Sequence, residues 1–312
     1  MATLHQILRD EWRAWRRRVA FRRFCRENPP GQDEVGVVMQ HGVGDHVLVA
    51  GLAAAIGRQH GARVVLAGRP AMRFISDLYP SVIRYVDLPA SCVGHEIGGS
   101  VIARGAWAYG HFRGMELARM VGYGDMGLLD AYRCLFGLNA DATLERPRLP
   151  DEPQRQQARA FLRERGHAPG RTIFLSAIAR STPLPSGGNG LFHEIKQALS
   201  LRGYTYLENE RLDPRGGLRS EIPLSLMRAI VAESGGFVAV RNGLCDLLCD
   251  LPVPGVILYS RERYLGGSLF RGTRVFPYGY TEHIREIEMP ADGDSAAVAA
   301  AVALQFNDNA AA

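Results

Sequence analysis

The stretch Val35-Gly36-Val37-Val38-Met39, followed by Gln40-His41-Gly42-Val43-Gly44-Asp45, decides the fold class. A short, almost wholly apolar run predicts a strand that is buried on both faces, as in a parallel sheet. Glycines at 42 and 44 predict a tight turn after it, and the apolar residues of 47–56 predict a helix that Gly57 ends. A strand, a glycine turn and a helix form the first half of a β-α-β unit.

The alternation of strand and helix continues towards the middle of the chain. Strands are expected at 63–67 and 83–86, with a helix at 70–78 between them. Residues 94–138 are less regular. In that region, 100–103 is a candidate strand, and 115–121 and 127–136 look helical.

Two prolines in the segment 145–150 mark a linker, after which a second alternation begins. Its expected strands are 172–176, 204–207, 236–240 and 256–259, and its expected helices are 154–165, 191–201, 224–233, 244–251 and 295–306. This rhythm predicts an α/β protein with two Rossmann-like, doubly wound parallel-sheet domains that face a cleft. The domains are expected at 31–150 and 151–312, preceded by a basic helix at 1–30.

The bulk composition narrows the class of protein. The 312 residues are 46% hydrophobic and 22% charged, which is ordinary for a globular protein, and no apolar run is long enough to span a bilayer. The five cysteines are scattered, which favours a reducing cytoplasm. Cys245 and Cys249 are four residues apart, but no second pair completes a zinc site, so no metal is expected.

Residues 4–27 hold the positive charge of the chain. Their eight arginines and three acidic residues give a net charge of +5, which equals that of the whole chain. Since the rest of the chain is neutral overall, it lacks the basic groove of a nucleic-acid-binding protein, and no nucleic-acid partner is expected. Apolar residues recur in this segment at helical spacing, namely Leu4, Leu8, Trp12, Trp15 and Val19. The helix suits the surface of an anionic membrane; alternatively, its apolar stripe packs onto the body of the protein or onto a second subunit.

Ligands of open parallel sheets bind at the carboxyl ends of the strands, so the turns after the strands are the candidate sites. In the first turn, Gly42, Gly44 and His46 are expected to line the cleft. Asp45 begins the helix, and its carboxylate either stabilises the first turn or acts as a general base. The third glycine of a dinucleotide-binding turn is replaced by Val47, which disfavours a nicotinamide enzyme.

The second turn, Arg241-Asn242-Gly243, runs from a strand into a helix. Free backbone N–H groups at a helix start and a forked guanidinium favour a phosphate site. Alternatively, Asn242 caps the helix and Arg241 pairs with a surface acid. Three further residues are candidates for contact with the same ligand: Ser176, Arg180 as a second phosphate contact, and Glu221 as an acceptor of hydrogen bonds from a ribose.

Both turns resemble those of bacterial glycosyltransferases of the two-Rossmann-domain (GT-B) type, near the heptosyltransferase family. Gly44-Asp45-His46-Val47-Leu48 resembles the Gly-Asp turn of that family. Arg241-Asn242-Gly243-Leu244-Cys245-Asp246 resembles the Arg-Ser-Gly-x-Cys-Asp form of surface-polysaccharide transferases.

This resemblance implies that a sugar is transferred, without a metal, from a nucleotide-activated donor to a bacterial surface glycan or a lipid-linked acceptor. It further implies that Asp45 is the general base and that Arg241, Asn242 and Gly243 contact the donor phosphates. The alternative function is a non-catalytic nucleotide- or sugar-binding accessory protein of a polysaccharide assembly complex. In either case the protein is expected in the cytoplasm, and residues 4–27 offer a peripheral contact with the inner membrane.

Overall fold

The computed structural model describes residues 4–92, 101–113, 115–179, 184, 189–212, 218–220, 222–261, 263–290 and 294–306. By its contacts the chain divides into two compact units. Unit 1 comprises Met1–Leu117 and Asp130–Pro147, and unit 2 comprises Ala118–Leu129 and Arg148–Ala312. Each unit contains one larger sheet whose strands are all parallel, which confirms the predicted α/β class with two parallel sheets. The cleft between them stays a prediction.

Unit 1 is built on a four-stranded sheet in the order β3-β2-β1-β4. In chain order its elements are α1 (Leu4–Glu27), β1 (Glu34–Val38), α2 (Val43–Gly51), α3 (Ala53–His60), β2 (Arg63–Gly68), η1 (Pro70–Met72), α4 (Arg73–Asp77), β3 (Val82–Asp87), η2 (Ala90–Cys92), β4 (Trp107–Tyr109) and most of α5 (Leu128–Leu135). Gly36 lets β4 pair closely with β1, because a Cβ there would lie 2.4 Å from the Trp107 ring. On one face of the sheet, Phe21 and Phe24 of α1 pack against Val38 and Trp107.

Two elements of unit 1 differ from the sequence prediction. The helix expected at 47–56 begins earlier, at Val43, and continues after Leu52 as a second helix, α3. The fourth strand is β4, whereas residues 101–103 of the candidate strand 100–103 form none, and Ser100 lies outside the described residues. Three residues are too short a run to show an alternating pattern, which is why β4 escaped prediction.

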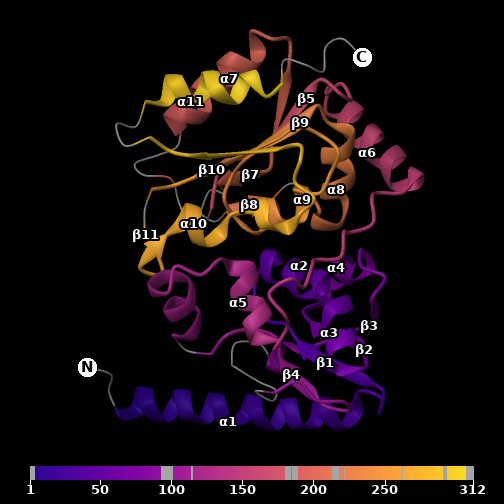
Figure 1. The fold of residues 1–312 in the computed structure, drawn as a ribbon. Coiled ribbons are helices and arrows are strands. Elements are labelled where there is room, and N and C mark those ends of the chain that lie inside the picture. The colour runs from indigo at the N-terminus through magenta and orange to yellow at the C-terminus, as the bar shows by residue number, and fades with distance from the viewer. Residues whose placement is uncertain are drawn as a thin grey trace. The chain divides into compact units, whose positions relative to one another are not determined.

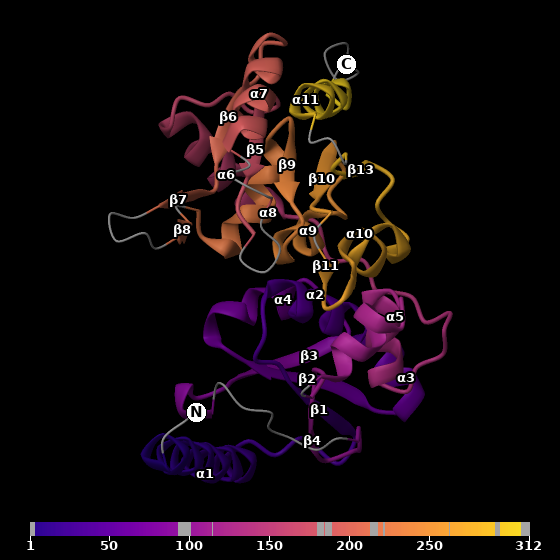
Figure 2. The same ribbon diagram turned by 90° about the vertical axis from the view of Figure 1, so that its left-hand side faces the viewer.

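Unit 2 is built on a five-stranded sheet in the order β13-β10-β9-β5-β6, whose neighbouring strands Figure 2 shows side by side. In chain order its elements are η3 (Ala118–Tyr123), α6 (Glu152–Glu164), β5 (Thr172–Ser176), α7 (Asn189–Ser200), β6 (Thr205–Glu208), β7 (Glu210–Leu212), β8 (Leu218–Ser220), α8 (Leu224–Glu233), β9 (Gly236–Val240), α9 (Gly243–Leu248), β10 (Gly255–Tyr259), β11 (Arg263–Tyr264), β12 (Gly267–Ser268), α10 (Leu269–Thr273), η4 (Phe276–Tyr278), β13 (Ile284–Glu288) and α11 (Ser295–Leu304).

Helices cover both faces of this sheet. Alternate residues of the central strands, such as Leu175, Val238 and Leu258, form one core with Ile195 of α7 and Val302 of α11. Helices α6 and α8 pack against each other on the other side of the sheet (Figure 1). The unit is therefore a doubly wound layer structure, in which the strands are buried on both faces.

None of the helices in the described part of the chain is both long and apolar enough to span a bilayer.

Candidate functional site

The topology of each sheet marks one place where a ligand is expected. In unit 1 the chain proceeds from β1 to β2 on one side and later adds β4 on the other side of β1. In unit 2, β5 lies between β6 and β9 in the same way. In open parallel sheets, ligands bind outside the carboxyl ends of the strands at such a switch point. The turn after β1 and the turn after β9, both predicted as sites, therefore lie where the fold favours binding.

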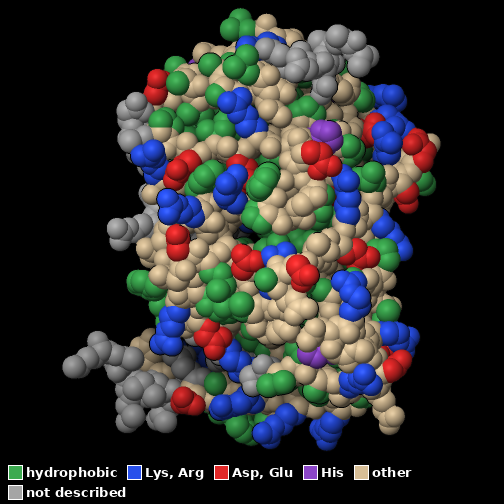
Figure 3. All heavy atoms as spheres, in the orientation of Figure 1, with side chains coloured by type: hydrophobic (Ala, Val, Ile, Leu, Met, Phe, Trp, Pro, Cys, Tyr) green, Lys and Arg blue, Asp and Glu red, His purple; other side chains and the backbone are tan. Residues whose placement is uncertain are grey.

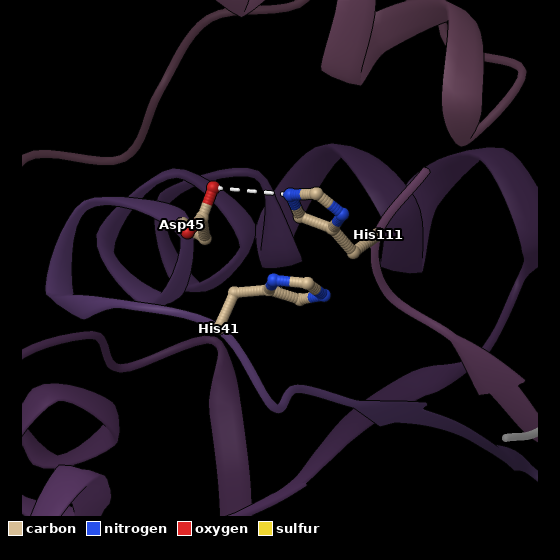
Figure 4. Close-up of side chains that lie close together, drawn as sticks. All are labelled: His41, Asp45 and His111. Carbon is tan, nitrogen blue, oxygen red and sulfur yellow. Dashed lines mark ion pairs between the residues drawn. The ribbon is translucent and has the colours of Figure 1, made fainter. Parts of the chain in front are cut away.

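At the switch point of unit 1, three side chains from two turns meet. His41 follows β1, Asp45 lies in the first turn of α2, and His111 follows β4 (Figure 4). The neighbouring carboxyl ends of β1 and β4 bring these two turns together, since Val38 is the partner of Tyr109 in the ladder. One nitrogen or oxygen atom of each of the three side chains lies within 4.8 Å of the others.

Asp45 is held by three donors. Its Oδ1 accepts a hydrogen bond of 2.7 Å from the Tyr132 hydroxyl of α5 and lies 3.4 Å from Nε2 of His111, and its Oδ2 accepts one of 3.1 Å from the Gly42 amide. Burial opposes ionisation of this carboxyl, but the bonds from His111 and Tyr132 outweigh it and lower the pKa of Asp45 to about 2. With this pKa the carboxylate is charged at neutral pH. Its side chain is 25% exposed, so it is also accessible to a ligand.

The two imidazoles of the cluster are stacked. The ring centroids of His41 and His111 are 3.6 Å apart and the ring planes differ by 20°. Nε2 of His41 forms a hydrogen bond of 2.7 Å with the hydroxyl of Tyr109, the last residue of β4. Partial burial and the neighbouring His111 lower the pKa of His41 to about 4, so its ring is neutral at physiological pH.

The other residues predicted for the first turn have supporting positions. Gly42 is the N-cap of α2 and Gly44 is buried in its first turn. His46 points into the core, with 1% of its surface exposed, and its Nδ1 donates a bond of 2.9 Å to the Gly42 carbonyl. Burial lowers the pKa of His46, which favours the neutral ring. The structure thus brings together Asp45 and the Gly42 amide, but leaves His46 out of the cluster.

In the turn of unit 2, the guanidinium of Arg241 is turned inwards. Two of its nitrogens donate bonds of 2.8 Å to the two oxygens of Asp246, and its Nε donates another of 2.8 Å to the Thr273 carbonyl. Both charged side chains are buried, at 5% and 3% exposure. Tyr278 donates a further bond of 2.6 Å to Asp246. Arg241 therefore pairs with an acid, as one of the two alternatives had it, but the acid is the buried Asp246 and not a residue of the surface.

Asn242 likewise has the structural role of a cap, since its Oδ1 accepts a bond from the Leu244 amide. Its amide group lies 3.3 Å from Oγ of Ser176, at the end of β5, and ties the two turns at this switch point together. Gly243 is the first residue of α9. Arg180 and Glu221 lie outside the described residues.

Three residues of the unit 1 cluster were not assigned a role from the sequence, namely His41, His111 and Tyr132. His41 was part of the quoted turn, and one signal pointed to it: a histidine directly after a buried strand. The same signal exists at Trp107-Ala108-Tyr109-Gly110-His111, but it is visible only once 107–109 is known to be a strand. Tyr132 lies 87 residues from its partner Asp45, and no local pattern reveals such a contact.

The comparisons with known proteins agree with this fold. No protein-family model and no curated protein sequence matches the chain. Among solved structures it is similar to an ADP-heptose lipopolysaccharide heptosyltransferase II of Escherichia coli, with 14% identity, a TM-score of 0.58 and coverage of 86% of this chain and 98% of that one. A family 9 glycosyltransferase of Veillonella parvula is 13% identical with a TM-score of 0.55, over 83% of this chain and 86% of that one. At these identities the comparison establishes a shared fold.

A third structure bears on the expectation that no metal is involved. The dodecameric glycosyltransferase TibC of enterotoxigenic E. coli, described as iron-containing, is 12% identical with a TM-score of 0.51, over 76% of this chain and 61% of that one. In the present chain, His41, Asp45 and His111 have the residue types and the spacing of metal ligands. The expectation of a metal-free protein, based on its cysteines and on the resemblance, is thereby corrected: it overlooked a histidine and carboxylate group assembled from two distant turns.

The observed orientation of the rings nevertheless does not fit a bound ion. A metal ligand binds through the lone pair in the plane of the imidazole, at about 2.0–2.1 Å for zinc. Stacked rings direct these lone pairs alongside each other instead of towards one point, so one of the two rings would have to turn.

Proposed function

We propose that the chain is a glycosyltransferase that moves a sugar from a nucleotide-activated donor to a hydroxyl of a bacterial surface glycan or a lipid-linked acceptor. The observation that carries this proposal is the accessible, ionised Asp45 between His111 and Tyr132 at the switch point of unit 1. The fold shared with a heptosyltransferase and a family 9 glycosyltransferase supports the same class of reaction.

In this proposal the Asp45–His111 pair accepts the proton of the acceptor hydroxyl. The hydroxyl oxygen forms a bond to the anomeric carbon of the donor sugar, while the bond from that carbon to the diphosphate breaks. The nucleoside diphosphate leaves with the electron pair, and the proton is later released to water. With a pKa of about 2, Asp45 alone is a weak base, because general bases act best with a pKa near the working pH. The His111 imidazole, 3.4 Å from Asp45, offers a second acceptor for the same proton.

For the donor side we propose the switch point of unit 2, between Ser176 and the turn Arg241-Asn242-Gly243. The buried Arg241–Asp246 pair fixes the turn, so phosphate contacts there come from backbone N–H groups and from Arg180, while Glu221 accepts hydrogen bonds from the ribose of the donor. The donor in this proposal is a sugar linked to a nucleoside diphosphate.

We further propose that the reaction takes place in the cytoplasm. All five cysteines are free thiols, and three of them are buried, which suits a reducing compartment.

The test is turnover of a panel of nucleotide sugars, ADP-linked ones included, with and without glycan acceptors. Asp45→Asn should lower transfer by about 10²–10⁴-fold, the usual contribution of a general base, while donor affinity measured by calorimetry stays within about twofold. Asp130→Asn is a matched control on the same unit, because Asp130 is 53% exposed and pairs only with Arg133 among the described contacts. Transfer that survives Asp45→Asn would remove Asp45 as proton acceptor.

The panel also separates the two functions predicted from the sequence. Donor binding without transfer to any acceptor would favour the non-catalytic accessory protein. A thermal-shift screen identifies the donor class in either case, since a ligand that binds the folded state raises its stability by mass action.

A further inference from the structure

The long helix α1 is attached to unit 1 by only one of its faces. Phe21 and Phe24, near its end, are buried in the core under the sheet, with exposures of 9% and 2%. The preceding part of the helix presents a second apolar face, made of Trp12, Trp15 and Val19. The sequence had left it three possible partners, namely an anionic membrane, the body of the protein or a second subunit.

This second face points away from the body. Phe21 follows Trp12 by nine positions and Phe24 follows Trp15 by nine positions, and at about 100° per residue nine positions amount to half a rotation. Accordingly, Trp12, Trp15 and Val19 are 55%, 56% and 45% exposed. Packing of Trp12, Trp15 and Val19 onto the body, one of the alternatives, is therefore wrong.

Arginines flank the exposed rings. Arg16, Arg22 and Arg26 lie on the same half of the helix as the tryptophans and are exposed. The guanidinium of Arg16 lies over the Trp12 ring, 4.7 Å from its centroid. Figure 3 shows Lys and Arg side chains gathered along the lower edge, where Figure 1 places α1.

From these observations we propose that the outer face of α1 binds the surface of an anionic lipid bilayer. Indole rings partition to the boundary between headgroups and acyl chains, and arginines beside them pair with lipid phosphates. The helix then lies in the plane of the surface, with Trp12, Trp15 and Val19 inserted and the arginines at the level of the headgroups. This contact is separate from the chemistry at Asp45 and places the protein beside a lipid-linked acceptor.

A second copy of the chain fits this face less well. Two such helices would bring arginine-rich faces of the same sign together, whereas an anionic bilayer is complementary to them. The apolar area is also small: two half-exposed tryptophans and a valine offer about 300 Å², against about 800 Å² per partner in a specific interface.

The experiment is cosedimentation of the full chain with vesicles of phosphatidylcholine, alone or partly replaced by phosphatidylglycerol, at low and high salt. Binding is expected only to the anionic vesicles and should weaken with salt. The chain has three tryptophans, and Trp107 is buried at 6% exposure, so a blue shift of the emission on binding reports Trp12 and Trp15.

Two double variants test the two components of the surface. Trp12→Ser with Trp15→Ser, and Arg22→Glu with Arg26→Glu, should each weaken vesicle binding at least about tenfold. Arg163→Glu with Arg165→Glu, the same charge change on exposed residues in and just after α6, should leave it within about twofold. All four tryptophan and arginine sites of the test variants are exposed, so thermal unfolding should be unchanged and a loss of binding is not a loss of fold.

Equal binding to neutral vesicles, or binding that survives the tryptophan double variant, would overturn the proposal. So would a dimer, detected by light scattering, that this variant dissociates. Transfer to a soluble acceptor is measured separately. A failure of vesicle binding therefore does not affect the glycosyltransferase proposal, and a failure of transfer does not affect the membrane proposal.

Discussion

The turn after β1 and the turn after β9 occupy equivalent places in their sheets, but the charged side chain is partly exposed in the first turn and buried in the second. Both follow a buried central strand at a switch point, and both carry a charged side chain. In the first, Asp45 is 25% exposed and its partners are groups that can exchange protons, His111 and Tyr132. In the second, Arg241 and Asp246 are buried and bonded to each other.

The difference shows that position at a switch point does not by itself assign a role to a charged side chain. A charge that touches substrate must keep part of its surface open, and a buried pair cannot do so without losing its partner. The Arg241–Asp246 pair fixes the backbone of its turn, and what remains for a ligand is the backbone itself. At the turn after β1, the side chains are what a ligand meets.

The variant with the largest expected effect is Arg241→Ala, which tests whether Arg241 has a structural role. If Arg241 is structural, its removal leaves Asp246 as a buried charge without its cation and should lower the free energy of unfolding by about 3–5 kcal/mol. Arg241→Lys keeps the positive charge but not the fork, and should lose less. Urea denaturation followed by circular dichroism measures both.

Arg271→Ala is the control for this prediction. Arg271 is 73% exposed and 3.5 Å from Asp125, so its loss should cost less than about 1 kcal/mol. A stable Arg241→Ala protein with weakened donor binding would contradict the structural role. It would indicate instead that Arg241 binds the donor phosphates.

These two turns also show how far sequence reasoning reached. The strands β1, β5, β9 and β10 were predictable because each is a continuous apolar run between turns. The turn residues followed from them, and so did the candidate status of Asp45. By contrast, β4 is three residues long, so His111 could not be placed beside Asp45. Pairing of Arg241 with a surface acid was only one of two alternatives, and the buried Asp246 was not foreseen as its partner, because the sequence does not show which way a guanidinium at a turn points.

The pH dependence of stability in His41→Gln tests whether the fold keeps the ring of His41 neutral in the turn after β1. The folded protein holds the pKa of His41 at about 4, below the ordinary value of about 6.5, so the unfolded chain takes up this proton first. The stability that His41 contributes is therefore present above pH 6.5 and is lost as the pH falls towards 4. Solvent screening of the partly exposed ring limits the effect to about 1–2 kcal/mol.

In His41→Gln this loss between pH 6.5 and 4 should disappear, while the loss at lower pH should remain. Asp45 accounts for part of the latter, since its contribution is present above the ordinary pKa of about 4 and is lost as the pH falls towards 2. Free energies of unfolding at a series of pH values separate the two windows. An unchanged profile in His41→Gln would mean that its ring is not held neutral by the fold.

The smallest expected effect is that of Tyr132→Phe, which tests whether the hydroxyl tunes Asp45 or only fills the core. Tyr132 is fully buried and donates a 2.7 Å bond to Oδ1 of Asp45, so its loss should cost about 1 kcal/mol of stability. Tyr204→Phe is the matched control in unit 2, where a buried hydroxyl donates 2.9 Å to the Phe306 carbonyl. Only Tyr132→Phe should raise the pKa of Asp45 and thereby reduce the loss of stability below pH 4, because the folded and unfolded pKa values approach each other. Equal acid profiles for the two variants would show that Tyr132 serves packing alone, and the low pKa of Asp45 would then rest on His111.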